Sequence, residues 1–305
     1  MQSKQNDWIA RACPLCGSDD ESRVYAESNI EFAALDGFAF ASRKDPEYMH
    51  YRLIECGTCG ILYGNPVLSP ATLVREYTEA HFSSSTEARF AALTYGFHLR
   101  VIAEQLPDLN GAIDIGAGDG AFLEQLMHLG FENICGIEPS EAPIRAASSS
   151  VRPLIRPGLF QAKDFEPESQ SLVTCFQTLE HLWDPLETAS AARSLLKRGG
   201  AFVGVVHNRK SLSAWCLGMK SPIFDVEHLQ LFCPSACMAL LERAGFVNIR
   251  VSSIWNRYPL AYWLKLLPIP KAVKPLLLSM VGRSGLGNFP VALPAGNLIC
   301  VGFKP

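Results

Sequence analysis

The chain has 305 residues, 48% of them hydrophobic, which is enough for one main domain with a sizeable core beside a smaller one. Its net charge of −3 and the lack of a basic run argue against strong electrostatic binding to nucleic acid. The polar N-terminus does not resemble a signal peptide, and the apolar stretch 258–281 is interrupted by prolines and lysines, so no membrane span is expected. These features predict a cytoplasmic protein.

The N-terminal region is distinguished by cysteine spacing. Four of the ten cysteines form two Cys-x-x-Cys pairs: Cys13, Cys16, Cys56 and Cys59. In a reducing compartment such pairs predict a metal site rather than disulfides, and four thiolates make a closed, structural Zn²⁺ site. Gly17 and Gly60 allow the backbone to curl toward the sulfurs. We expect residues 1–66 to form a small zinc-ribbon-like module, with strands or a hairpin in the insert 30–41.

Two helices are expected next. Ser69 is a suitable N-cap and Pro70 a suitable first residue for a helix that runs to Glu79. A second helix is expected at about 86–105. Residues 67–110 would then form a helical linker that caps the ligand pocket of the following domain. Within the second helix, Tyr95 and Arg100 are candidates for contact with that pocket, with ordinary packing or surface roles as the alternative.

A glycine-rich turn follows the first buried strand. Residues 113–120 are Ile-Asp-Ile-Gly-Ala-Gly-Asp-Gly, and Glu138 ends the next apolar run. Gly116 and Gly118 let the backbone approach a ligand closely, and the N–H groups that open the following helix attract a carboxylate or phosphate. An acidic residue about 20 positions on can accept hydrogen bonds from both ribose hydroxyls. The pattern predicts a nucleotide-type cofactor.

Two cofactors are compatible with these glycines. The series Gly116-x-Gly118-x-x-Ala121 also fits the dinucleotide-binding fingerprint. Asp114 lies two residues before the first glycine, where a carboxylate is unfavourable beside a pyrophosphate. It suits a cofactor that carries an ammonium group, such as S-adenosylmethionine. A nicotinamide-dependent oxidoreductase remains as the weaker alternative.

From residue 111 onward strands and helices alternate, which requires a parallel sheet with helices on both faces. The predicted strands are 111–116, 133–138, 152–156, 171–177, 200–206, 247–254 and 297–303. The predicted helices are 120–129, 141–149, 186–197 and 234–244. The Pro-broken apolar segment 258–293 is expected to be a helical cap on the substrate side or an interface.

Four blocks in this order resemble the class I S-adenosylmethionine-dependent methyltransferases. Asp114-Ile-Gly-Ala-Gly-Asp-Gly120 is similar to their motif I, and Gly136-Ile-Glu-Pro-Ser140 to their second-strand segment. Leu179-Glu-His-Leu-Trp-Asp-Pro185 and Leu195-Leu-Lys-Arg-Gly-Gly200 resemble the blocks around strands four and five. In the last block Arg198 stands where the family usually has proline. The resemblance covers about residues 90–255.

The resemblance implies a Rossmann-like, seven-stranded α/β domain over 111–305 whose last strand inserts antiparallel beside its predecessor. It implies that Gln177 points at the methionyl end of the cofactor. Asp164 would accept the adenine amino group and Phe165 would flank the ring, with a solvated loop as the alternative. The full set of cofactor-binding residues that it implies is Asp114, Gly116, Ala117, Gly118, Glu138, Pro139, Asp164, Phe165 and Gln177.

Three histidines follow the carboxyl ends of predicted strands, where ligands bind in open parallel sheets. They are His181, His207 and His228. An imidazole titrates near neutral pH and can take a proton from a hydroxyl or an activated carbon during methyl transfer. We expect His228 to be the base, oriented by Glu227, with His181 as the second candidate. A hydrogen-bonded structural role is the alternative for each histidine.

Two narrower resemblances bear on metals. The segment Gln177-Thr-Leu-Glu180-His181 is similar to a Glu-x-x-Glu-His motif that can hold a divalent metal in ubiquinone-biosynthesis O-methyltransferases. The amide of Gln177 is a poorer ligand for a hard cation than a carboxylate, so no metal is expected there. The cysteine pairs, followed by Leu62-Tyr-Gly-Asn-Pro66 and the cofactor blocks, resemble zinc-containing bacterial methyltransferases, including sugar C-methyltransferases. Those sugar enzymes have a further large C-terminal domain, which is not expected here.

The sequence therefore predicts methyl transfer from S-adenosylmethionine to a small-molecule acceptor, including a sugar or sugar-containing metabolite. In-line alignment and exclusion of water would supply the catalysis, and Zn²⁺ would be structural. One alternative is a zinc-ribbon RNA-binding or RNA-modifying protein, for which Arg43, Lys44 and Arg52 supply few charges. Another is a non-catalytic S-adenosylmethionine binder. The acceptor, the methylated atom and the oligomeric state stay open.

Overall fold

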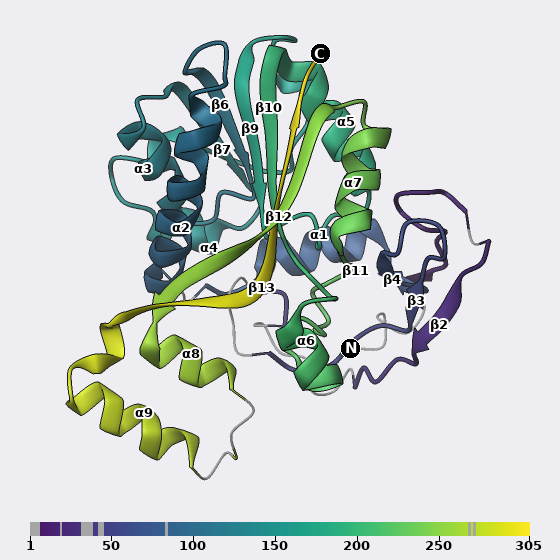
Figure 1. Ribbon diagram of the computed structural model, residues 1–305, viewed down its shortest axis with the longest axis vertical. Helices are drawn as coiled ribbons and strands as arrows, with labels where there is room; N and C mark the ends of the chain where they lie inside the picture. Colours follow the sequence, from purple (N-terminus) through teal and green to yellow (C-terminus); the bar gives the residue numbers. More distant parts are fainter. Residues whose placement is uncertain are drawn as a thin grey trace.

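The computed structural model describes residues 7–18, 20–31, 39–41, 46–82, 85–267, 270 and 273–305. Its centre is a seven-stranded sheet with the order β12-β13-β10-β9-β6-β7-β8 (Figure 1). β13 runs antiparallel to both β10 and β12, and the other strands run parallel to one another. The predicted fold and the antiparallel insertion of the last strand are confirmed. The strands are β6 (Asn110–Ile115), β7 (Glu132–Glu138), β8 (Ile155–Pro157), β9 (Gln170–Phe176), β10 (Leu196–His207), β12 (Val247–Pro259) and β13 (Pro290–Phe303).

Both faces of this sheet are covered because successive side chains of its central strands point to opposite sides. Ala112 of β6 packs with apolar side chains from α2 and α3. Ile113, the next residue, packs with side chains from α5 and α7 on the other face. The helices around the sheet are α2 (Ser85–Ala103), α3 (Ala121–His128), α4 (Glu141–Ala146), α5 (Pro185–Leu195), α6 (Leu212–Leu217) and α7 (Pro234–Arg243).

The helix that precedes α2 begins as its sequence predicts. α1 (Pro70–Glu79) has proline at its first position, and the Ser69 side chain accepts a hydrogen bond from the Thr72 N–H at 3.3 Å. This contact satisfies one of the N–H groups that lack a partner within the helix. The cap thereby sets where α1 starts.

The N-terminal module is joined to the rest of the chain by a shared sheet. β2 (Arg23–Ala26), β3 (Leu53–Glu55) and β4 (Leu62–Gly64) are extended by β11 (Gln230–Leu231), which pairs antiparallel with β4. The sheet therefore crosses the boundary predicted at residue 66. A further pair, β1 (Trp8–Ile9) with β5 (Val67–Leu68), crosses it as well.

Part of the predicted module falls outside the residues described. In the predicted insert 30–41, residues 32–38 are not described, and the remaining residues carry no strand. Arg43 and Lys44, two of the three basic residues weighed for RNA binding, also lie outside the described residues. The expected hairpin in this insert therefore stays a prediction.

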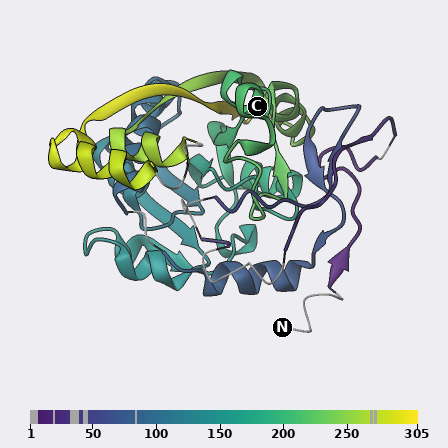
Figure 2. The ribbon, with the colours of Figure 1, turned by 90° about the horizontal axis from the view of Figure 1, so that it is seen from below.

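The predicted cap 258–293 has a different shape from the one expected. β12 and β13 are longer than predicted and continue as a two-stranded ribbon, with Asn256 to Pro259 paired against Leu293 to Pro290. At the far end of this ribbon lie α8 (Leu260–Leu266), α9 (Lys274–Arg283) and η6 (Leu286–Asn288), which pack on one another. We call α8, α9 and η6 together the arm. Figures 1 and 2 show it projecting from the sheet.

Among the described residues, none of the helices combines the length and apolar character that crossing a bilayer requires.

Candidate functional site

A cavity of about 540 Å³ lies at the carboxyl ends of β6, β7, β9 and β10. Residues 114–119 and 138–140, which include the ends of β6 and β7 and the turns after them, line the part that we call the glycine end. His181, His207 and His228 line the part that we call the histidine end. Side chains of α1 and α2, including Tyr95, also line the cavity, as expected of a helical cap, whereas Arg100 is exposed outside it.

The backbone of the glycine end depends on two glycines for different reasons. Gly116 has φ +79°, and a Cβ there would collide with the Thr178 hydroxyl. Gly118 has φ +57° and no atom within 4 Å of the position of a Cβ, so its backbone is open to the cavity. Both backbone conformations are unfavourable for residues other than glycine. The turn therefore brings N–H groups and bare backbone to the cavity surface.

Two buried carboxyl groups line this end. Glu138 accepts hydrogen bonds from the N–H groups of Gly118 at 2.8 Å and Ser140 at 2.9 Å. Asp114 accepts a hydrogen bond from the Thr174 hydroxyl at 2.6 Å. Burial raises the pKa of Glu138 and raises the pKa of Asp114 to about 7, because it penalises the charged forms. A cationic group at Asp114 and hydroxyl donors at Glu138 would offset that penalty, so these residues fit S-adenosylmethionine.

The other residues predicted at the glycine end divide into two groups. Ala117, Pro139 and Gln177 line the cavity. Gln177 has φ +49°, and its N–H donates to the Val205 carbonyl at 2.6 Å. This bond holds the turn after β9 against β10 and keeps Gln177 at the cavity.

Asp164 and Phe165 lie outside the lining of the cavity, contrary to their predicted adenine contacts. Asp164 is exposed in η4 (Ala162–Asp164), and the Arg156 guanidinium lies over the Phe165 ring at 5.0 Å. The Gly158 N–H donates to the Glu138 carbonyl at 2.9 Å, which continues the parallel pairing of β8 with β7 as far as the cavity. Leu159 and Phe160, which come next in the chain, line the cavity instead.

The histidine end brings three imidazole rings together. The centroid of the His228 ring lies 5.0 Å from that of His181 and 5.2 Å from that of His207. In each ring Nδ1 faces an oxygen: the Ile223 carbonyl at 2.8 Å for His228, the Glu227 carbonyl at 3.0 Å for His181, and Asn297 Oδ1 at 2.9 Å for His207. An acceptor at Nδ1 favours the neutral tautomer with the proton on Nδ1 and the lone pair on Nε2. The backbone carbonyls at Nδ1 of His228 and His181 accept only, so they favour this tautomer for those two rings.

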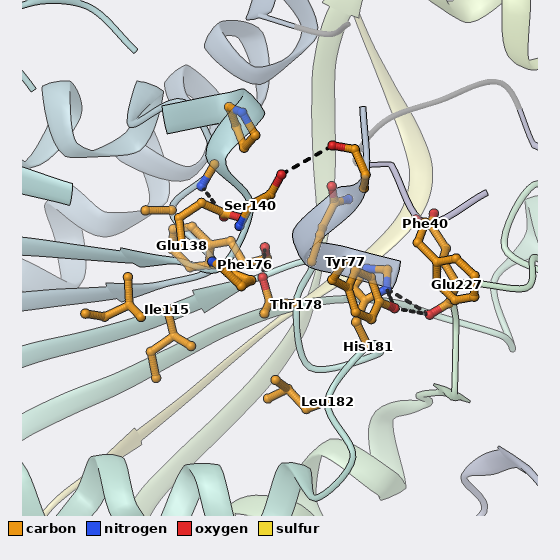
Figure 3. A pocket seen from close by; sticks show the side chains of 18 of the residues that line it. Phe40, Tyr77, Ile115, Glu138, Ser140, Phe176, Thr178, His181, Leu182 and Glu227 are labelled. Atoms are coloured by element: carbon orange, nitrogen blue, oxygen red, sulfur yellow. Dashed lines mark hydrogen bonds between the residues drawn. The ribbon is translucent and has the colours of Figure 1, made fainter. Parts of the chain in front are cut away.

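Glu227 and Tyr77 connect two of these histidines. Glu227 Oε1 lies 3.8 Å from His228 Nε2, while the Ile223 carbonyl orients the ring from the Nδ1 side. The Tyr77 hydroxyl donates to the Glu227 carbonyl at 2.7 Å and lies 3.1 Å from His181 Nδ1 (Figure 3). The carboxylate is therefore placed to pair with His228 when that ring is protonated.

Sequence reasoning missed two aromatic residues of this end. Tyr77 comes from α1, and Phe40, whose ring packs edge-on against Tyr77 at 5.4 Å, comes from the N-terminal module. Both line the cavity. No motif surrounds either residue, so the sequence carries no signal for them beyond an apolar position.

Glu180, the middle residue of the metal-like motif, points into the core. Its side chain is fully buried, and Oε1 accepts a hydrogen bond from the His207 N–H at 2.6 Å. Burial raises the pKa of Glu180 to about 8. Glu180 therefore does not line the cavity. Its hydrogen bond supports the backbone at the end of β10, next to the histidine end.

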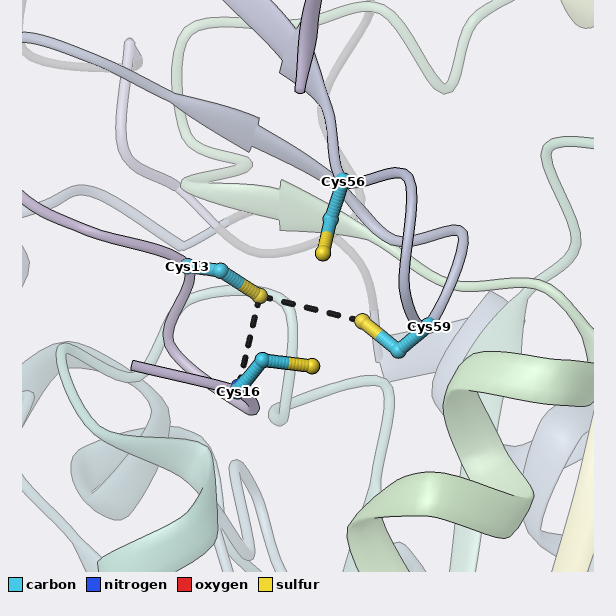
Figure 4. Close-up of side chains that lie close together, drawn as sticks. All are labelled: Cys13, Cys16, Cys56 and Cys59. Atoms are coloured by element: carbon cyan, nitrogen blue, oxygen red, sulfur yellow. Dashed lines mark hydrogen bonds between the residues drawn. The ribbon is translucent and has the colours of Figure 1, made fainter. Parts of the chain in front are cut away.

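The four paired cysteines form one cluster (Figure 4). Their sulfur atoms all lie within 4.8 Å of one another, and Cys13 Sγ is 3.7 Å from Cys59 Sγ. Sulfurs around a tetrahedral Zn²⁺ with bonds of about 2.3 Å are about 3.8 Å apart. The N–H groups of Gly17 and Gly60 donate to the carbonyls of Cys13 and Cys56 at 2.8 and 2.9 Å, which forms the turn after each pair. The donor set and spacing fit Zn²⁺.

Side chains link this cluster to the histidine end. The Arg11 guanidinium donates to Gln230 Oε1 at 3.0 Å, and Gln230 Nε2 donates to the carbonyls of Leu179 at 2.6 Å and Leu182 at 2.8 Å. These carbonyls flank His181. Ser235, in the first turn of α7, donates to the Cys59 carbonyl at 2.9 Å. The module is thereby attached to the loop that carries His181.

Residues 89–251 match the family model described as "Methyltransferase domain". The ubiquinone biosynthesis O-methyltransferase of Idiomarina loihiensis is 24% identical over 47% of this chain and 63% of its own length. Those of Colwellia psychrerythraea and Methylococcus capsulatus are 27% and 32% identical over 52% and 48% of this chain and 71% and 60% of their own lengths. The chain thus spans less than two thirds of the Idiomarina and Methylococcus relatives.

Two solved structures also match this chain. A S-adenosylmethionine-dependent methyltransferase of Thermotoga maritima, titled a possible histamine N-methyltransferase, has a TM-score of 0.47 and 20% identity over 72% of this chain and 91% of its own. Another from Archaeoglobus fulgidus has a TM-score of 0.48 and 18% identity over 77% of this chain and 100% of its own.

Proposed function

Because this chain belongs to the methyltransferase-domain family, we propose that it is an S-adenosylmethionine-dependent enzyme that methylates a hydroxyl group of a small molecule with an apolar body. The observation that carries this proposal is the histidine end. There, three imidazoles line a cavity walled by aromatic side chains such as Phe40 and Tyr77. The backbone carbonyls at Nδ1 of His228 and His181 favour Nε2 as the basic nitrogen of those two rings.

The glycine end would hold the cofactor. S-adenosylmethionine supplies a methyl group on a positively charged sulfur, which is already a good leaving group. The Asp114 carboxylate would bind the ammonium group, and Glu138 would accept hydrogen bonds from the ribose hydroxyls. Leu159 and Phe160 offer apolar surface for the adenine ring in place of Asp164 and Phe165. Gln177 would lie toward the methionyl part.

The histidine end would bind and deprotonate the acceptor. His228 is the proposed base, because its Nδ1 is held by the Ile223 carbonyl while Nε2 faces Glu227 at 3.8 Å. After Nε2 takes the acceptor proton, the carboxylate would stabilise the imidazolium. His181, held by Glu227 and Tyr77, is the second candidate. The matched relatives, which are named as O-methyltransferases, support a hydroxyl acceptor.

The cysteine module would act through structure alone. Cys13, Cys16, Cys56 and Cys59 would hold Zn²⁺ with every coordination position filled by protein, so the ion would have no position for substrate. The contacts from Arg11 through Gln230 to the His181 loop suggest that the module sets the shape of the acceptor site. A chelator should then reduce turnover by disturbing this loop.

An acceptor panel tests the proposal. Purified protein with S-adenosylmethionine would be offered phenols and catechols with apolar substituents, a nucleotide sugar, and transfer RNA. Mass spectrometry would follow S-adenosylhomocysteine and the methylated product, with His228→Gln as the matched variant. We expect O-methylated phenols from the wild type and strongly reduced product from the variant. Methylation of the sugar carbon or the RNA alone, or cofactor binding with no methylated acceptor, would contradict the proposal.

A further inference from the structure

The C-terminal part of the chain has an unusual charge distribution. Residues 243–305 contain eight Lys and Arg and no Asp or Glu. In residues 1–242, nineteen Lys and Arg face thirty Asp and Glu. The protein is negative overall, yet this C-terminal segment carries only positive side-chain charges. The segment includes the ribbon and the arm.

The arm also exposes large apolar side chains. Leu276 is 62% exposed and Met280 is 60% exposed, and with Val273 they are spaced by three and four residues, which puts them on one face of α9. Phe289, just after η6, is 60% exposed. Lys274 and Arg283 lie at the two ends of the same helix. Residues 273–289 thus form an amphipathic surface whose charges are all positive.

The position of the arm leaves this surface accessible. α9 packs on α8 and η6 at the far end of the ribbon (Figures 1 and 2). α8 is the half of the arm that reaches the body, because Tyr262 and Leu266 line the cavity. In the ribbon itself Trp255 is 62% exposed, and tryptophan is a residue that favours the boundary between water and lipid.

We propose that the arm docks on an anionic lipid surface. Val273, Leu276, Met280 and Phe289 would enter the boundary between headgroups and acyl chains, while Lys274 and Arg283 would contact the headgroups. An apolar face flanked only by basic residues is the composition of helices that lie in a membrane interface. The same composition disfavours pairing arm against arm in two copies, because like charges would meet. Docking would place the wall of the cavity formed by α8 next to lipid.

Vesicle co-sedimentation tests this proposal with the full chain. The probes are vesicles of phosphatidylcholine alone and of phosphatidylcholine mixed with phosphatidylglycerol. We expect the wild type to bind the anionic vesicles at least about tenfold more tightly, and added salt to weaken this binding. The double variant Leu276→Glu/Met280→Glu should lose at least about tenfold in binding, and Lys274→Glu/Arg283→Glu should lose the preference for anionic lipid.

Matched controls are available elsewhere on the surface. Met127→Glu introduces a negative charge at an exposed apolar position of α3. Arg198→Glu reverses an exposed positive charge near the start of β10. Both should bind vesicles like the wild type, and all variants should keep the wild-type stabilisation by S-adenosylhomocysteine. Equal binding to both kinds of vesicle, or equal losses in arm and control variants, would overturn the proposal. The proposal would also be overturned if the wild type bound no vesicles and formed a dimer in sedimentation velocity that Leu276→Glu/Met280→Glu abolished.

Discussion

The two ends of the cavity are assembled in different ways. The glycine end is formed mainly by residues 114–119 and 138–140, which lie at the ends of neighbouring parallel strands and close in sequence. The histidine end combines Phe40 and Tyr77 with three histidines: His207 ends β10, and the other two precede α5 and β11. One end depends on short-range turns, whereas the other depends on a module that shares a sheet with the body. This difference predicts that the two ends can be damaged separately.

Loss of the metal should have the largest effect. Structural Zn²⁺ contributes on the order of 10 kcal/mol to the folding of small modules, which is comparable to the whole stability of a typical domain. Chelation, or Cys56→Ser, should lower the melting temperature and increase hydrogen exchange in residues 179–182, because Gln230 connects those carbonyls to the module. Calorimetry and mass spectrometry would measure both effects.

The control for this change is Cys216→Ser, at an exposed cysteine of α6 outside the cluster. It should leave melting and exchange unchanged. Cofactor affinity should survive in the chelated protein better than turnover does. An equal loss of both would show that the two ends do not behave separately.

Removal of the proposed base should have the next largest effect. His228→Gln should lower kcat by about 10²–10⁴, the usual contribution of a positioned general base, with little change in the Kd of S-adenosylhomocysteine. His98→Gln, at a half-buried histidine of α2 outside the cavity lining, is the matched control. If His181→Gln reduced kcat while His228→Gln did not, the base would be His181.

Removal of the buried charge at the glycine end should affect binding instead. Asp114→Asn should raise the Kd of S-adenosylmethionine about ten- to hundredfold, the range for losing a hydrogen bond to a charged group. Isothermal titration calorimetry measures this directly. Asp108→Asn, at a carboxylate that pairs with Lys197 outside the cavity lining, should bind the cofactor normally. An unchanged Kd in Asp114→Asn would remove the ammonium site from the proposal.

The same carboxyl group predicts a pH dependence. Burial raises the pKa of Asp114 from 3.8 to about 7 in the ligand-free protein. The unfolded chain would ionise this group at about pH 4, whereas the folded protein keeps it protonated up to about pH 7. The free energy of unfolding should therefore fall between about pH 4 and pH 7, by up to about 1.4 kcal/mol per pH unit. Ligand-free Asp114→Asn should therefore gain stability relative to the wild type across that range. Cofactor binding by the wild type should tighten as the carboxyl ionises, and a flat profile in urea unfolding and calorimetry would contradict this.

Loss of a single hydroxyl at the histidine end should have the smallest effect. Tyr77→Phe removes the hydrogen bond to the Glu227 carbonyl and should cost about 0.5–1.5 kcal/mol in the free energy of unfolding. Urea denaturation would measure it, with Tyr25→Phe in the exposed β2 as the control. Cofactor Kd should not change. A shift in that Kd equal to the loss of stability would show that the ends are coupled.

The sequence determined the features that depend on neighbours along the chain. The glycine turn, the Ser69 cap and the acidic residue at the end of β7 were predictable because positive φ, helix capping and strand periodicity are short-range properties. The paired cysteines were predictable as one cluster because metal ligation imposes a spacing on each pair.

Only the tertiary structure decided which distant residues meet. Leu159 and Phe160 line the cavity in place of Asp164 and Phe165 because they directly follow β8, whose pairing with the end of β7 continues to Gly158. Tyr77 meets the histidines because α1 packs against the segment that precedes β11, where the Tyr77 hydroxyl donates to the Glu227 carbonyl. The ribbon lengthened because β12 and β13 pair with each other beyond the edge of the sheet. Such contacts depend on long-range packing, which a local pattern of residue types does not specify.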